Sequence, residues 1–121
     1  MNFKITISES GNYVIAKVYG EINREIAQKL SSESEAFAAN HNIKRALVDV
    51  RECRNTDTVQ ANIAYSKKDV PFPRRNAFEK MANLVSPDDT SHSLVIVELA
   101  NEGYNIAMFT DEQEAIEWLE K

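Results

Sequence analysis

The last eighteen residues, YNIAMFTDEQEAIEWLEK, predict a buried strand that leads directly into an amphipathic helix. The apolar run at residues 104–109 has the length of a strand, and the helix after it carries one apolar stripe, formed by Ala115, Ile116 and Leu119. Thr110 precedes Gln113 by three residues, which is the spacing of a capping box and predicts Thr110 as the helix N-cap. Because such a helix must cover a sheet, this ending favours an α/β fold.

The same alternation recurs upstream and predicts the order ββαβαβαβα. The expected elements before the C-terminal pair are hairpin strands in FKITIS and YVIAKVYG, a helix over 21–39, a strand over 46–50, a helix from Thr56 or Thr58 to Asp69, a strand over 77–85 and a helix in SLVIVELANEG. The run ALVDV at 46–50 is typical of a strand buried on both faces. We therefore expect a mixed five-stranded sheet with four helices, forming one α/β domain over residues 1–121.

The segment SLVIVELANEG is ambiguous, because its β-branched residues would also suit a strand. We expect a helix, since SPDDTS before it offers N-cap residues, Gly103 suits the left-handed position after a helix, and parallel strands need a crossover here. In that helix Ile96, Leu99 and Ala100 would face the sheet. Leu94 and Val95 would be partly spare, and we expect them at the contact of a homodimer.

Composition limits the classes of function. The chain has 121 residues, 43% of them hydrophobic, which is enough to bury a core without disulfides or a metal. Its single cysteine suits a reducing compartment, and it has neither a signal-peptide pattern nor an apolar run of about 18 residues. We expect a cytoplasmic protein without stable membrane insertion. The net charge of −5 argues against a nucleic-acid partner, because binding phosphates needs a basic face.

The residues that could carry chemistry do not form a recognisable catalytic or metal-binding motif. His41, His92 and Cys53 are far apart in the sequence, and zinc needs about four converging ligands. RECRN around Cys53 has no nucleophile pattern, so we interpret Cys53 as a surface-loop cysteine. We therefore expect no enzyme activity, no metal and no cofactor.

The element order, the VDV strand followed by a loop and a helix, and the ending FTDEQEAIEWL resemble the STAS family of bacterial anti-sigma-factor antagonists. Within it the chain is most similar to a small stand-alone branch often grouped with the lipid-binding Sec14 fold. The resemblance implies a SpoIIAA-like (STAS-like) α/β fold and a non-catalytic regulatory role through contacts with a protein partner.

The antagonists carry an acidic or polar residue at the end of the third strand and an Asp-Ser-Ser-Gly element eight residues later. Asp49 and Asp57 stand at that spacing, and Thr58 follows, but Val59 replaces the usual phosphoacceptor serine. Thr56, Asp57 and Thr58 are therefore a candidate regulatory loop, in which phosphate on Thr56 or Thr58 would lie at a helix N-terminus. The alternative, which we favour, is that these side chains only cap the helix.

A second candidate lies in SKKDVPFPRR, where basic residues flank an aromatic one on a proline-stiffened loop. Its candidate contact residues are Lys67, Lys68, Phe72, Arg74 and Arg75. They could meet an anionic membrane surface or an acidic region of another subunit. The favoured alternative is a helix end whose lysines answer the dipole, followed by a loop whose Phe72 folds back onto the core.

The expected function is thus a non-catalytic interaction or regulatory module. The alternative is a carrier or sensor of an apolar small molecule or lipid, suggested by the Sec14-like grouping and by an apolar run at 94–97 that exceeds one helix face.

Overall fold

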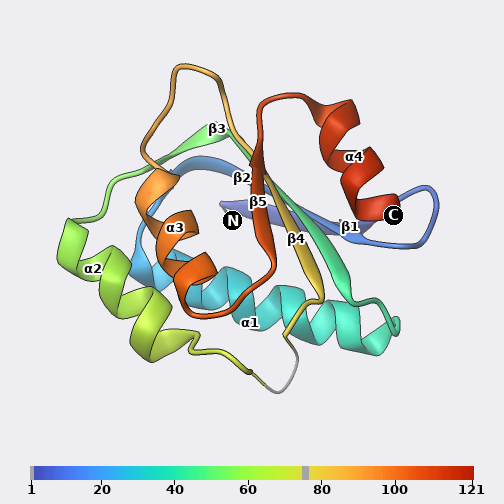
Figure 1. Ribbon diagram of the computed structural model, residues 1–121, viewed down its shortest axis with the longest axis horizontal. Helices are drawn as coiled ribbons and strands as arrows, with labels where there is room; N and C mark the ends of the chain where they lie inside the picture. Colours follow the sequence, from blue (N-terminus) through green and yellow to red (C-terminus); the bar gives the residue numbers. More distant parts are fainter. Residues whose placement is uncertain (1, 75–76) are drawn as a thin grey trace.

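A five-stranded sheet with helices on both faces makes up the computed structural model, which describes residues 2–74 and 77–121 (Figure 1). In chain order its elements are β1 (Phe3–Ile7), β2 (Val14–Ile22), α1 (Arg24–Asn40), β3 (Arg45–Asn55), α2 (Val59–Ala64), the π-helical turn η1 (Tyr65–Asp69), β4 (Lys80–Leu84), α3 (Ser93–Asn101), β5 (Ile106–Phe109) and α4 (Glu112–Glu120). The predicted α/β class and the order of strands and helices are confirmed, including the helix in SLVIVELANEG. No helix within the described ranges is long and apolar enough to cross a membrane.

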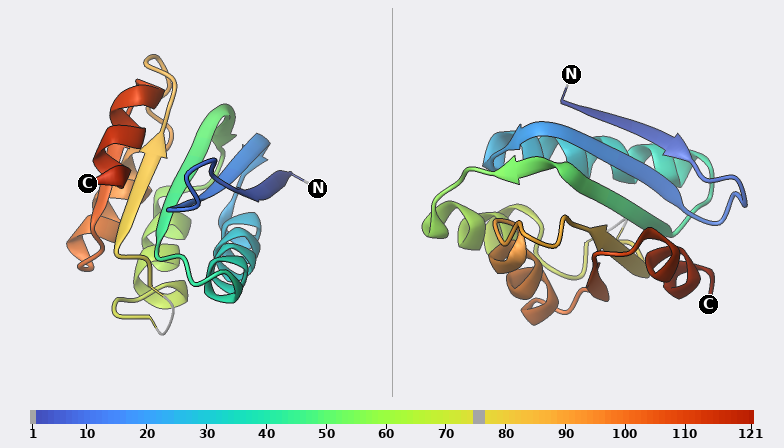
Figure 2. Two further views of the ribbon diagram at one scale, coloured as in Figure 1. Left: turned by 90° about the vertical axis from the view of Figure 1, so that its right-hand side faces the viewer. Right: turned by 90° about the horizontal axis from the view of Figure 1, so that it is seen from above.

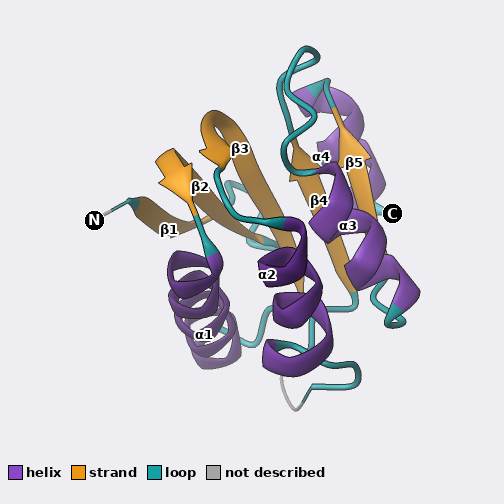
Figure 3. Cartoon of the chain, turned by 90° about the vertical axis from the view of Figure 1, so that its left-hand side faces the viewer, coloured by secondary structure: helices purple, strands orange, loops and turns teal. Residues whose placement is uncertain are grey.

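The strands lie in the sheet in the same order as in the chain, β1-β2-β3-β4-β5. β1 and β2 form an antiparallel hairpin, whereas the pairs β2/β3, β3/β4 and β4/β5 are parallel. Crossovers between parallel strands are right-handed, so three successive crossovers in one direction place their helices on one face. Accordingly α1, α2 and α3 lie together in front of the sheet in Figure 3, and α4 lies behind it.

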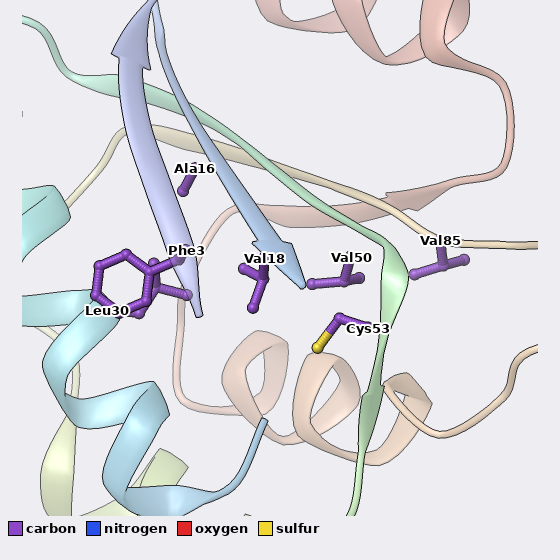
Figure 4. Close-up of a cluster of buried hydrophobic side chains, with 7 residues drawn as sticks. All are labelled: Phe3, Ala16, Val18, Leu30, Val50, Cys53 and Val85. Carbon is purple, nitrogen blue, oxygen red and sulfur yellow. The ribbon is translucent and has the colours of Figure 1, made fainter. Parts of the chain in front are cut away.

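Two separate apolar layers follow from this arrangement. On the side of α1 the buried cluster of Figure 4 comprises Phe3, Ala16, Val18, Leu30, Val50, Cys53 and Val85. On the other side of the sheet, where α4 lies (Figure 2), the cluster comprises Tyr13, Leu47, Ala82, Leu84, Ala115 and Leu119. The alternation of Ala46 and Leu47 between the faces of β3 is the period-two pattern of a strand covered on both sides.

The N-cap of α4 differs from the prediction. The helix begins at Glu112, and the side chain of Asp111 accepts a hydrogen bond of 3.2 Å from the backbone N–H of Glu114. Asp111 therefore occupies the cap position predicted for Thr110, because aspartate caps at least as well as threonine and the helix starts one residue later. At the other end of α4, Lys80 Nζ donates to the Trp118 carbonyl over 2.8 Å, which satisfies a free carbonyl with a cation.

Several boundaries also differ. β3 continues to Asn55, five residues beyond the predicted end at Val50, because this segment pairs with the end of β2, with Cys53 opposite Gly20. The second helix reaches Asp69 as predicted, but its last five residues widen into the π-helical turn η1. β4 begins at Lys80 and not at residue 77.

Candidate functional site

The candidate regulatory loop is held by its own hydrogen bonds. The Thr58 hydroxyl accepts from the Ala61 N–H over 3.1 Å and caps α2. The Asp57 carboxylate accepts from the backbone N–H of Arg24, and the Thr56 N–H donates to the Ile22 carbonyl over 3.0 Å. These contacts are the ones expected if the three side chains have only a structural role at the start of the helix. The helix that they precede, α2, has only six residues.

The candidate surface loop is tied to neighbouring helices by ion pairs. Lys67 Nζ lies 3.0 Å from a carboxylate oxygen of Glu102, and Arg74 Nη2 lies 3.1 Å from one of Glu35. Lys68 is exposed, and Arg75 lies outside the described residues. The charges of Lys67 and Arg74 are thus compensated within the chain.

The Phe72 side chain is partly packed against the rest of the chain and partly exposed to solvent. Its ring meets Tyr104 edge to face, with ring centroids 5.2 Å apart. It also covers Gly103, where an added Cβ would lie only 3.0 Å from the ring and the φ of +108° disfavours other residues. Yet 44% of Phe72 remains exposed, so it folds back only in part.

The face of α3 that is buried against the sheet differs in part from the predicted one. Ile96 is buried and Leu99 is half-buried as expected, but Ala100 is exposed, so its predicted contact with the sheet is wrong. Leu94 and Val95, the candidate dimer contact, are both half-buried, and Val95 lines an internal cavity. The most exposed member of the run is Val97, at 54%.

Cys53 is a core residue and not the surface-loop cysteine that we predicted, because β3 continues through it and directs its side chain into the cluster of Figure 4. Burial raises the pKa of its thiol to about 11, which keeps it protonated and a poor nucleophile. His92 is also buried, and its Nε2–H donates to the Cys53 carbonyl over 2.9 Å. Within the part of the chain that the structure describes, no three potential ligands among His, Cys, Asp and Glu gather as a metal site would require.

A cavity of about 130 Å³ lies between the sheet and helices α1, α2 and α3. Much of its wall is apolar, and its apolar residues include Ala16, Ala27, Ala46, Val48, Val50, Met81, Val95, Ile96, Leu99 and Ile106. Asn23, an exposed lining residue, lies at one end together with Arg24 and Asp57, which places an opening between the start of α1 and the loop after β3. The small side chains on β2, β3 and α1 leave the space that larger ones would fill.

Four polar side chains on the cavity wall are already paired with one another. The Tyr65 hydroxyl is hydrogen-bonded to the Ser31 hydroxyl, and burial raises the pKa of Tyr65 to about 12. Asn55 Nδ2 donates to Asn62 Oδ1 over 2.7 Å. These pairs are structural, because each holds the α2–η1 segment to a neighbouring element.

Two other polar side chains on the wall are different. The Ser34 hydroxyl on α1 is buried and has no hydrogen-bond partner among residues 2–74 and 77–121, and Ser34 as a whole is 6% exposed. The side-chain amide of Asn83 on β4 likewise makes no hydrogen bond within these ranges. Buried polar groups are nearly always paired, so the Ser34 hydroxyl has unused capacity to bind. Asn83 is half-buried, and its amide is free to bind as well.

An ion pair beside the opening joins α1 to η1. Arg24 Nε and Nη2 donate to the two carboxylate oxygens of Asp69 over 2.7 and 2.9 Å, and Gln28 Nε2 donates to the same carboxylate over 2.8 Å. The hydrogen bond from Arg24 is the main cause that lowers the pKa of Asp69. η1 is therefore held over the cavity by a charged contact at its end.

On the opposite face of the sheet, Asp49 is the centre of a charged cluster. Its carboxylate accepts from Arg51 Nε over 3.0 Å and from Arg51 Nη2 over 2.8 Å, and Lys17 Nζ lies 3.9 Å away. Arg51 also reaches Glu112 of α4 at 3.3 Å. The structure does not bring Asp49 and Asp57 into one site. Asp49 pairs with Arg51 on the α4 face, whereas Asp57 accepts from the backbone at the start of α1.

Comparison with known proteins defines the class. A family model described as SpoIIAA-like matches residues 13–120, and the chain belongs to this SpoIIAA-like (STAS) family. No curated protein is significantly similar to it.

Two solved structures share the fold. One is an uncharacterized protein with a SpoIIAA-like fold from Shewanella loihica PV-4, 20% identical, with a TM-score of 0.61 over 97% of this chain and 91% of the other. The other is an anti-sigma factor antagonist from Mycobacterium paratuberculosis, 12% identical, with a TM-score of 0.60 over 98% of this chain and 95% of the other. At these identities the likeness concerns the fold.

Proposed function

We propose that this chain is a non-catalytic binding module that holds a small, mainly apolar molecule between its sheet and helices α1, α2 and α3. The observation that carries the proposal is the cavity of about 130 Å³ with its largely apolar wall. An engineered apolar cavity of about 150 Å³ binds benzene, so this volume suits a molecule of similar size. The cavity opens at the carboxyl ends of parallel strands, where α/β proteins commonly bind ligands.

Native mass spectrometry of the protein purified from its own host tests this proposal. We expect an added mass that is lost on denaturation. Ala27→Leu, which fills the cavity wall on α1, should abolish it, whereas Ala36→Leu, at an exposed position of the same helix, should not. A parent protein without added mass, whose unfolding temperature also fails to rise in toluene-saturated buffer, would contradict the proposal.

The second candidate is a role through protein contacts, as the family resemblance implies. Exposed apolar side chains on neighbouring segments favour it: Val59 at the start of α2, Phe72 before β4 and Val97 on α3 are 57%, 44% and 54% exposed. Figure 3 shows α2 and α3 side by side. Exposed apolar side chains that gather into one patch commonly mark an interface, including that of a homodimer.

Sedimentation equilibrium at high micromolar concentration tests the homodimer. We expect a dimer that Val97→Glu weakens and that Ala36→Glu, on exposed α1 surface, leaves intact. A monomer at these concentrations would exclude the homodimer.

A further inference from the structure

The polar residues on the cavity wall indicate which kind of ligand the cavity binds. This inference rests on the proposed function, because it concerns the ligand of the same cavity. The buried Ser34 hydroxyl, without a partner in the described part of the chain, can donate one hydrogen bond and accept others. The Asn83 amide can donate through nitrogen and accept through oxygen. An entirely apolar occupant would leave the buried Ser34 hydroxyl unpaired and would cover the half-buried Asn83 amide without binding it, which is unfavourable.

The charged residues of the wall argue against an anionic occupant. The guanidinium of Arg24 is bonded to Asp69, and the Asp57 carboxylate is bonded to the Arg24 backbone. His92 Nε2 lies 3.5 Å from an Asp89 carboxylate oxygen as well as donating to Cys53. The Arg24 guanidinium is thus already neutralised by Asp69, and His92 is already hydrogen-bonded. An anionic ligand would lose its hydration without finding a free cation among the described residues of the wall, and that is costly.

We propose that the cavity binds a neutral molecule of about six to eight non-hydrogen atoms, with an apolar body and a single hydroxyl or carbonyl group. The Ser34 hydroxyl and the Asn83 amide bind that polar group, and the alanine and branched aliphatic residues of the wall contact the body. Benzyl alcohol has this size and this balance of surfaces. Toluene has the same ring without a polar group. Benzoate has the same ring with an ionised carboxylate.

These three probes, titrated at pH 7 into the isotopically labelled protein and followed by NMR chemical shifts, test the proposal. We expect benzyl alcohol to shift resonances of cavity-lining residues and to bind about tenfold more tightly than benzoate. Ser34→Ala should weaken benzyl alcohol about tenfold and leave toluene within about twofold, because it removes one hydroxyl from the wall. Asn83→Ala serves as a second variant with the same expected selectivity. Ser32→Ala, at an exposed position of α1, is the matched control and should change nothing.

The outcomes separate this proposal from the one it rests on. If no probe, toluene included, shifts a cavity resonance, the binding function fails and this proposal fails with it. If toluene binds but benzoate binds as tightly as benzyl alcohol, the cavity is a binding site and the assignment of a neutral ligand is wrong. If benzyl alcohol binds both Ser34→Ala and Asn83→Ala as tightly as it binds the parent, these residues do not recognise the polar group and the proposal is overturned.

Discussion

Asp49→Asn removes the charge at the centre of the cluster beneath α4 while keeping the size of the side chain. The Asp49 side chain is only 7% exposed, and its carboxylate takes two hydrogen bonds from the Arg51 guanidinium. Hydrogen bonds to charged groups contribute roughly 1.5–3 kcal/mol each when buried. Because 36% of the Arg51 side chain is exposed, water can replace part of what the guanidinium loses. We therefore expect a total cost of about 2 kcal/mol.

Urea unfolding at pH 7, followed by tryptophan fluorescence, measures this cost. Glu52→Gln is the matched control, because Glu52 also pairs with Lys17 on this face but is 58% exposed, and its loss should stay within about 0.5 kcal/mol. If Asp49→Asn unfolds like Glu52→Gln, the cluster does not stabilise the fold and the reasoning is refuted.

The pH dependence of the difference gives a second check. Burial by itself would raise the pKa of Asp49, but the hydrogen bonds and the charge of Arg51, with Lys17 nearby, hold it below its ordinary value of 3.8. A lowered native pKa means that the stabilisation is complete above the unfolded pKa and is lost as the pH falls through the native one. The advantage of the parent over Asp49→Asn should therefore be constant from pH 7 to about 5 and shrink below about pH 4.

Four further outcomes are expected. Asp111→Ala should cost about 1 kcal/mol in urea unfolding and Thr110→Ala less than about 0.5, and the reverse order would restore the capping box predicted from the sequence. Trp118→Ala removes the single tryptophan, so its urea unfolding is followed by circular dichroism. It should cost about 3 kcal/mol, because the half-buried indole packs on the aromatic residue at the end of β5; unchanged stability would mean that α4 is not docked. Cys53 should react with a thiol reagent at pH 8 only when urea is added, and rapid reaction without urea would contradict its burial. Thr58→Glu should change stability by no more than about 1 kcal/mol, since an acid at a helix N-terminus offsets the lost cap, and intact-mass detection of phosphate at this position in protein from the native host would contradict a purely structural role.

The element order was predictable from the sequence because apolar periodicity reports which faces are buried. The elements that ended differently from the prediction are those where tertiary contacts override local pattern. Residues 51–55 are mostly charged and look like a loop, yet they pair with β2 and form the end of β3. Thr110 and Asp111 are both good caps, and only the point at which the chain leaves β5 decides between them.

The cavity was less predictable, because empty space depends on how several elements pack together. The sequence suggested an apolar ligand only through the surplus run at residues 94–97. A further signal lay in the inward positions of β2, β3 and α1, which carry alanine or serine where a filled core would have larger residues, such as Ala16, Ala46 and Ser34. That signal could be recognised only once the inward face of each element was known.

The agreement between strand order in the sheet and strand order in the chain has a consequence for how this protein folds. Each strand pairs with the strand that immediately precedes it, so no pairing has to wait for a distant segment. Pairing between neighbours in the chain keeps each loop closure shorter than pairing between distant strands would, which lowers its entropic cost. On the ribosome, the hairpin, α1 and β3 can assemble before the second half of the chain has been synthesised, and each later strand then adds to an edge that already exists.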